Sequence, residues 1–310
     1  MRPLGAPSQP PYSRRGPKSS GIGGAERALR SSVDMVDVEL LYLEHLSEAD
    51  RRLLRSAVGA DVPVEVALGS PATEEAVFEH GDRVMVAIGI SPFLAFATAV
   101  HRTAARLDTA TFVEERWAPR ARIPVFDVAS LRTLVADPER RYFLVELLAS
   151  YTRVSSGVTW TRTRRGWRRR RFSELEPGRL AELLEVVQAS ERPGIYRRLG
   201  DLALFLLGVF PDHPPTLGRG AATERLLRLS GVRDDRVAEL GPFELLETLG
   251  ARWYAAAVAA AKAAGHPVTE TLAVAGYMSE HFRDARRVLN AVTDCYLFPW
   301  RDQWFGSGDR

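Results

Sequence analysis

Cysteine and lysine are nearly missing from this chain of 310 residues. The only cysteine is Cys295, and the only lysines are Lys18 and Lys262. A single cysteine cannot form an intramolecular disulfide, and the six histidines include no pair with the spacing of a zinc site. We therefore expect no metal site, no disulfide and a reducing, cytoplasmic setting.

Common catalytic and cofactor motifs are also missing. The sequence has no Gly-x-Ser-x-Gly elbow and no Walker lysine loop, and its one glycine-rich stretch, residues 21–24, has no apolar periodicity around it. We expect no cofactor, and we lean towards a protein that is not an enzyme. Catalytic groups can converge from distant positions, so an enzyme without a recognisable motif stays an alternative.

Long apolar runs are missing too. The longest uncharged run, residues 84–100, has 17 residues and is interrupted by Gly89, Ser91 and Pro92. It is shorter than the roughly 20 apolar residues of a transmembrane helix. The first residues include arginines but no apolar core of signal-peptide length. We expect neither membrane insertion nor export.

Positive charge is concentrated in one short segment. The chain has a formal net charge of +3, yet residues 162–171 hold seven arginines and no acidic residue. The remaining residues carry 35 basic side chains against 39 acidic ones. A basic segment on an acidic body either recruits an anionic partner or neutralises an acidic surface of its own body or of a second subunit.

Composition divides the chain into three regions. Residues 1–34 are rich in Pro, Gly, Ser and Arg and show no apolar periodicity, so we expect a disordered tail there. Met35 could itself serve as the start, in which case this tail does not belong to the native protein. We expect a smaller mixed α/β region over residues 35–125 and a helical domain over residues 126–310 that contains the basic segment.

Helix signals dominate the chain and predict a mainly α fold, an irregular helical bundle. A serine or aspartate before a proline predicts helices that begin at Pro92 and Pro138, and Asp127 precedes another. Residues 193–210 are apolar on nearly all sides after Leu199, which predicts a helix in the middle of the bundle. Further helices are predicted over residues 177–187, 223–230, 242–264, 269–281 and 284–298.

A few short strands are expected near the N-terminal third. Valine and leucine alternate over residues 62–68, and residues 83–90 form a second β-branched apolar run. At the other end of the chain, residues 296–305 are dense in aromatic side chains. We expect these aromatics to dock the last helix onto the bundle, because large exposed aromatic patches are disfavoured.

The segment from about residue 158 to residue 172 predicts a β-hairpin arm. Threonine, valine, tryptophan and phenylalanine stand at strand-like positions around Arg165 and Gly166, which we interpret as a two-residue turn. This turn predicts three cross-strand pairs on one face. The pairs are Arg164 with Trp167, Arg162 with Arg169, and Trp160 with Arg171.

Interleaved guanidinium and indole groups are suited to phosphate contact and to stacking on unpaired bases. Our first hypothesis is a non-enzymatic protein that binds an anionic partner through this arm, with RNA or single-stranded DNA first. In the alternatives, the arginines pair with acidic groups of the protein's own body, or the arm of an assembly factor meets an acidic surface of another protein. The candidate binding residues are Trp160, Arg162, Arg164, Arg165, Trp167, Arg168, Arg169, Arg170 and Arg171.

Three blocks of the sequence resemble an uncharacterised group of actinobacterial proteins. They are RRGWRRRRFSEL at residues 164–175, YRRLGDLALFL at residues 196–206 and DARRVLNAVTD at residues 284–294. The similarity covers roughly residues 35–305. Because that group has no assigned activity, the resemblance implies a bacterial cytoplasmic setting and no functional residue.

Overall fold

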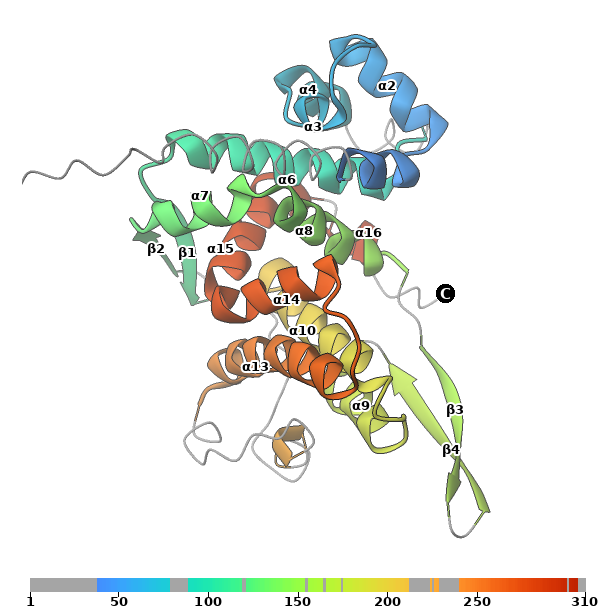
Figure 1. Ribbon diagram of the computed structural model, residues 1–310. Helices are drawn as coiled ribbons and strands as arrows, with labels where there is room; N and C mark the ends of the chain where they lie inside the picture. Colours follow the sequence, from blue (N-terminus) through green and yellow to red (C-terminus); the bar gives the residue numbers. More distant parts are fainter. Residues whose placement is uncertain are drawn as a thin grey trace, which may run out of the picture. The chain divides into compact units, whose positions relative to one another are not determined.

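A computed structural model describes most of the chain from residue 38 onward (Figure 1). The chain divides into two units after residue 37, and every described residue belongs to the second unit. The expected tail and residues 83–88 of the second expected strand therefore lie outside the described part. The described residues are 38–78, 89–118, 121–153, 156–163, 166–173, 175–211, 224, 226–228, 240–299 and 301–305.

Short helices precede the first long one. Residues 38–45 are helical. Ser47 caps the next helix by accepting a hydrogen bond from the Asp50 backbone N–H at 3.1 Å, and the Asp50 carboxylate accepts one from the Ser47 N–H at 2.8 Å. This reciprocal capping box fixes where the helix starts. The helices that follow are α2 (Glu48–Val58), α3 (Val64–Leu68) and α4 (Pro71–Phe78).

The strand expected over residues 62–68 is wrong, because five of these residues form α3. Pro63 stands at the N-cap, and the Val64 N–H donates to the Glu39 carboxylate at 3.1 Å. Leu68 is fully buried while Val66 is 62% exposed. The alternation of apolar residues here belongs to one helical turn and a half, and the contact with Glu39 is one that no local pattern encodes.

Helix α6 (Pro92–Thr109) is buried along most of its length. As predicted, Ser91 caps it by accepting from the Leu94 N–H at 3.1 Å, with Pro92 as the first helical residue. Helix α6 packs against α3 and α4, which precede it in the chain, and also against helices that follow it. Packing is therefore continuous between the two regions expected from composition.

A small antiparallel pair of strands follows α6, at positions where we expected none. β1 (Val113–Ala118) pairs with β2 (Ala121–Val125). The pair is tied to a distant helix, because the Glu115 carboxylate in β1 accepts a hydrogen bond from Arg287 at 2.8 Å. The strands thus depend on a residue far along the chain.

The next two helices begin where the sequence predicted. Asp137 caps α8 (Pro138–Ser150) by accepting from the Arg140 N–H at 3.1 Å. Asp127 precedes α7 (Val128–Ala136) but makes no side-chain cap hydrogen bond. The chain then forms the hairpin β3 (Ser156–Thr163) and β4 (Gly166–Ser173), the short helix α9 (Pro177–Ala181) and a 3₁₀ turn (Glu182–Glu185).

Helix α10 (Arg192–Val209) packs closely against α13 (Pro242–Ala263). Residues 199–205 are all buried, which confirms the predicted central helix. Glycine makes the close approach possible, because a Cβ added at Gly200 would lie 2.6 Å from the ring of Tyr254. Overlap of that kind cannot be absorbed without moving the helices apart.

The last helices cover the bundle. They are α14 (Glu270–Glu280), α15 (Phe282–Val292), a π-helical turn (Thr293–Leu297) and α16 (Arg301–Phe305). The Phe305 ring stacks on Phe96 with centroids 5.4 Å apart and meets the edge of Phe205 at 5.0 Å. Trp304 meets the edge of Phe96 at 5.0 Å. The expected docking of the C-terminal aromatics is confirmed for these two residues and for Tyr296, which is 5% exposed, whereas Phe298 is 54% exposed.

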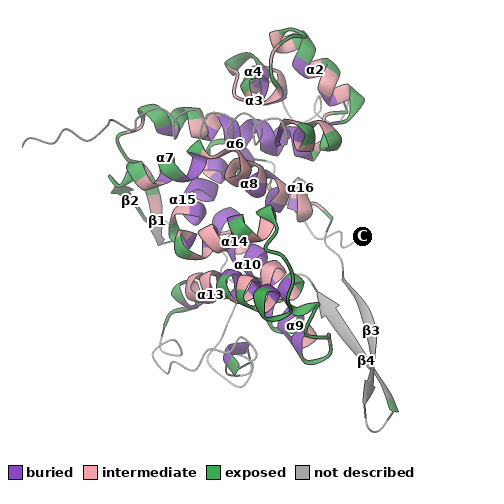
Figure 2. Cartoon of the chain, in the orientation of Figure 1, coloured by how far each residue is buried: buried purple, intermediate pink, exposed green. Residues whose placement is uncertain are grey.

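The described chain is mainly α with a β-hairpin, as the sequence predicted. Buried residues lie along α6, α8, α10, α13 and α15 (Figure 2), and α6 packs against α7, α8 and α15. Among the described helices, none is both long enough and apolar enough to cross a membrane.

Candidate anion-binding site

The predicted hairpin is present, and its register differs from the prediction by two residues. Thr163 is paired with Gly166, so Arg164 and Arg165 join the strands. Gly166 has a φ of 109°, a conformation that glycine adopts at little cost. The expected turn at Arg165 and Gly166 is therefore wrong.

A shift of two residues keeps the alternation along both strands, whereas a shift of one would reverse it. Because directly paired positions share one face of an antiparallel ribbon, five of the six positions expected on the arginine and tryptophan face remain together. The pairs on this face are Trp160 with Arg169, Arg162 with Trp167, and Val158 with Arg171.

The remaining candidate residues divide between the other face and the connection. Arg168 is paired with Thr161, and Arg170 with Thr159. Arg164 and Arg165 lie outside the described residues. The side chains of Trp160 and Trp167 are not described either. We call the paired strands β3 and β4 the arginine ribbon.

Helix α9 anchors the base of the arginine ribbon. β4 packs against α9, whose Pro177, Leu180 and Ala181 are buried. Leu175, between strand and helix, packs against the hydrophobic core. The ribbon therefore starts from a fixed position on the helical body.

A second basic feature lies close to this base in the sequence. A cleft of about 420 Å³ opens between α8 and α10, and three arginines are among its lining residues. Arg153, the last of the α8 side, precedes β3 by three residues. We call this the hairpin-foot cleft. It is lined by Glu146, Leu147, Ser150, Arg153, Gly194, Arg197 and Arg198.

Two of these arginines are held in place by the body. The Arg198 guanidinium donates to the Ser150 hydroxyl at 2.8 Å and lies 4.0 Å from the centre of the Tyr151 ring. Tyr151 is itself fully buried and stacks on Phe205 at 4.2 Å. Arg197 donates to the Glu146 carboxylate at 2.9 Å. Their guanidinium groups are thus held in place by contacts within the protein.

Behind Arg197 lies a buried carboxyl group, that of Asp201, which the sequence suggested as an end cap of the apolar helix and which lies inside α10 instead. Arg197 Nε is 3.6 Å from Asp201 Oδ2, and the Tyr254 hydroxyl donates to Asp201 Oδ1 at 2.8 Å. Burial raises the pKa of Asp201 to about 6, against the lowering effect of the Arg197 charge. An acidic residue inside an otherwise apolar helix was the available signal, but its partner Tyr254 lies 53 residues away.

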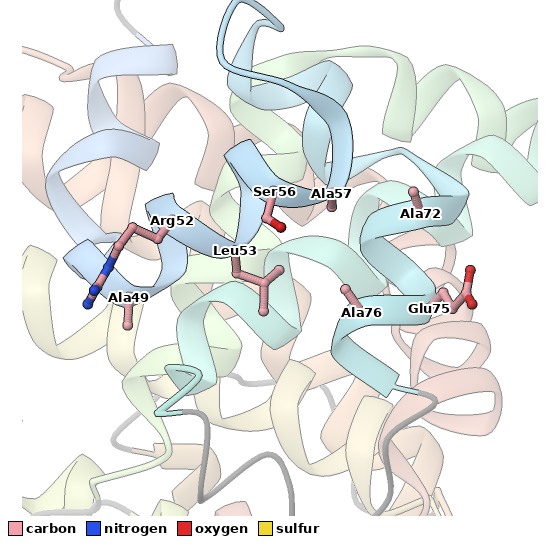
Figure 3. Close-up of a pocket in the computed structure, with 8 residues that line it drawn as sticks. All are labelled: Ala49, Arg52, Leu53, Ser56, Ala57, Ala72, Glu75 and Ala76. Atoms are coloured by element: carbon pink, nitrogen blue, oxygen red, sulfur yellow. The ribbon is translucent and has the colours of Figure 1, made fainter.

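Another hollow lies elsewhere, between α2 and α4. It measures about 590 Å³, and four of its eight lining residues are alanines, with Leu53 between them. Figure 3 shows Arg52 at one end and Glu75 at the other. With one charge of each sign and a floor of small side chains, this groove offers no concentrated charge and no reactive pair.

Other buried titratable groups serve packing. His101 Nε2 lies 2.9 Å from the Tyr42 hydroxyl in the core, and burial lowers the pKa of His101 to about 3. The Arg286 guanidinium, 2% exposed, contacts both Glu115 and Glu247. Within the described residues, no group of three or more His, Cys, Asp or Glu side chains could hold a metal ion.

Comparison with known proteins adds no relative. No protein-family model, no curated protein and no solved structure matches this chain. The resemblance to the actinobacterial group therefore stays an expectation, and function has to be inferred from the residues themselves.

Proposed function

We propose that this protein binds RNA or single-stranded DNA through the arginine ribbon, without catalysing a reaction. The observation that carries the proposal is the register of the ribbon, in which Trp160 is paired with Arg169 and Arg162 with Trp167. Each pair combines a cation with an aromatic ring on one face. Repetition along the ribbon provides alternating sites for phosphate and base.

The chemistry of the two residue types supports a nucleic acid as the partner. Guanidinium groups bind phosphate oxygens through two parallel hydrogen bonds. Indole rings stack on unpaired bases of any identity. A folded two-stranded ribbon limits the conformations that these groups must lose on binding.

The charge distribution supports the same partner. Seven arginines between residues 162 and 171 lie on a chain whose other residues are acidic on balance. Localised positive charge attracts a polyanion to the ribbon and disfavours contact elsewhere on the body. Binding should release counterions, so affinity should fall steeply as salt increases.

The test compares two fourfold variants of equal charge. In the first, Arg162, Arg164, Arg169 and Arg171 are changed to serine; in the control, the exposed arginines Arg52, Arg55, Arg179 and Arg228 are changed. Fluorescence anisotropy with a labelled 20-nucleotide RNA measures the dissociation constant from about 50 to 300 mM salt.

The ribbon variant should bind the RNA at least about 100-fold more weakly at low salt. The slope of log affinity against log salt should also be smaller in magnitude by about 3, because each of the four lost single-strand contacts contributes about 0.7. The control should retain most of the affinity and the slope. Equal losses in both variants would contradict the proposal. An unchanged RNA affinity together with dissociation of an oligomer would assign the ribbon to an acidic protein surface instead.

A further inference from the structure

We propose that one face of the arginine ribbon recognises the ribose 2′-hydroxyl group, so that the protein selects RNA over DNA. This selection rests on the proposed function, because it concerns the same ribbon and decides which of the two nucleic acids binds. In the register of the ribbon, Trp160 and Arg162 occupy one face, and three threonines of β3 occupy the other, which we call the threonine face. These threonines are Thr159, Thr161 and Thr163.

The threonine face combines hydroxyl and guanidinium residues in a regular row. Each of the first two threonines is paired with an arginine of β4, and the third is paired with the glycine that follows the connection. The pairs are Thr159 with Arg170, Thr161 with Arg168, and Thr163 with Gly166. Because every second residue of a strand lies on the same face, the three threonine positions form a row of about 13 Å along β3.

Within residues 158–172, threonine is the only residue type whose side chain accepts a hydrogen bond. The other residues of this segment are arginine, tryptophan, valine, phenylalanine and glycine. Guanidinium and indole groups only donate hydrogen bonds, whereas a hydroxyl group both donates and accepts them. A ligand group that donates a hydrogen bond to a side chain of this segment must therefore donate it to a threonine.

The ribose 2′-hydroxyl group is such a donor, and it is the group by which a protein distinguishes RNA from DNA. Phosphate oxygens are present in both nucleic acids and accept hydrogen bonds, so arginine binds the backbone of either one. Stacking of bases on tryptophan is also common to RNA and DNA. Of the residue types in the segment, threonine alone can accept the hydrogen bond that only RNA offers.

The two faces of the ribbon suit different parts of a nucleotide. Trp160 and Trp167 share their face with arginines, a combination that suits bases and phosphates. The threonine face has arginines and hydroxyl residues but no tryptophan, which suits phosphates and riboses. A strand of unpaired RNA that wraps around the ribbon would contact both faces. A regular duplex offers no unstacked base to the tryptophans.

Threonine is also favoured in strands for its shape, because β-branched residues fit the extended backbone. Valine has the same branched shape and lacks the hydroxyl group. Replacing all three threonines of the threonine face by valine therefore keeps the strand preference and the net charge, and removes the three acceptors. We call Thr159→Val/Thr161→Val/Thr163→Val the acceptor variant.

Fluorescence anisotropy with labelled 20-nucleotide probes of one sequence tests the selection. The probes are RNA, DNA and 2′-fluoro RNA, which keeps the sugar conformation of RNA but has no donor at the 2′ position. The wild type should bind RNA at least about tenfold more tightly than either other probe, since each net hydrogen bond contributes a factor of roughly 2 to 12. This comparison uses the unaltered protein, so it does not depend on how a substituted ribbon folds.

The acceptor variant should bind all three probes with affinities equal to within about twofold, close to the affinity of the wild type for DNA. The control Thr109→Val/Thr133→Val changes two exposed threonines whose hydroxyl groups donate to carbonyl groups of their own helices, and it should keep the preference for RNA.

Equal binding of RNA, DNA and 2′-fluoro RNA by the wild type would overturn the selection of RNA and leave the proposed function standing. An undiminished preference for RNA in the acceptor variant would do the same, because the 2′-hydroxyl group would then be recognised elsewhere. Absence of saturable binding of every probe by the wild type would contradict the proposed function itself, on which the selection rests.

Discussion

Arg162 in β3 is paired directly with Trp167 in β4. Directly paired positions share one face of an antiparallel ribbon, so an arginine position and a tryptophan position are neighbours on that face. The expected register paired Arg162 with Arg169 instead. The observed pairing separates like charges across the strands, which reduces the repulsion that a ribbon of seven arginines must otherwise overcome.

The tryptophans of the ribbon should contribute stacking that survives high salt. Trp167→Ala should weaken RNA binding by about 1–3 kcal/mol, or roughly 5- to 150-fold, because a base loses its aromatic platform. Trp167→Phe keeps an aromatic ring and should retain most of the affinity. Anisotropy titrations at about 300 mM salt measure both, since screening then suppresses the arginine contribution. Equal affinities for the alanine and phenylalanine variants would exclude stacking at this position.

The buried carboxyl of Asp201 should make stability depend on pH in a specific direction. Its pKa of about 6 in the folded protein exceeds the value in an unfolded chain, so its favourable contribution is present below about pH 4 and is lost as pH rises through about 6. Asp201→Asn removes this titration. The groups that face it are Arg197, Arg198, Glu146 and Tyr254.

Urea unfolding of wild type and Asp201→Asn between pH 5 and pH 7.5 measures the effect as a difference, in which the other titrating groups cancel. Between pH 5 and pH 7.5, the free energy of unfolding of Asp201→Asn should rise relative to that of the wild type by on the order of 1 kcal/mol. A stability difference that is constant with pH would show that Asp201 titrates in the folded protein as it does in the unfolded chain.

Two glycines of α10 should respond oppositely to alanine. Gly200→Ala should destabilise the protein by about 1–3 kcal/mol, because the added methyl group would lie 2.6 Å from the Tyr254 ring. Gly194→Ala in the same helix meets open space and should be neutral or stabilising by up to about 1 kcal/mol. Thermal unfolding compares them, and similar shifts in both would contradict the close packing of α10 on α13.

Two arginines that share a carboxylate should differ sharply in importance. Arg286 and Arg283 both contact Glu247, but the Arg286 side chain is 2% exposed and that of Arg283 is 63% exposed. Arg286→Met removes the buried cation that Glu115 and Glu247, each with a side chain 14% exposed, share, and should cost about 3–5 kcal/mol. Arg283→Met should cost less than about 1 kcal/mol. Urea unfolding distinguishes the two, and equal costs would contradict the buried network.

Local chemistry predicted where many helices begin. Ser91 and Asp137 each accept a hydrogen bond from the backbone three residues on, and this capping is encoded in neighbouring residues. The strand expected over residues 62–68 failed because alternation over so few residues does not distinguish a strand from one and a half helical turns. Glu39, which caps that helix from outside, belongs to another element.

The features that sequence could not supply are those made by distant partners. β1 depends on Glu115 meeting Arg287, 172 residues later, and the Asp201 site depends on Tyr254. The ribbon was visible because its composition is unusual, but its register, in which Thr163 is paired with Gly166, differs by two residues from the expected one. The hairpin-foot cleft unites α8 with the start of α10, which no linear motif joins.

Photocrosslinking tests the central claim most directly, because it locates the nucleic acid on the chain. Wild-type protein is irradiated with a 4-thiouridine-containing 20-nucleotide RNA and cut after glutamate, which releases residues 147–174 as one fragment because it contains no internal glutamate. We predict that this fragment carries the RNA adduct at Trp160 or Trp167. An unmodified fragment, with the adduct found only on other parts of the chain, would contradict the account.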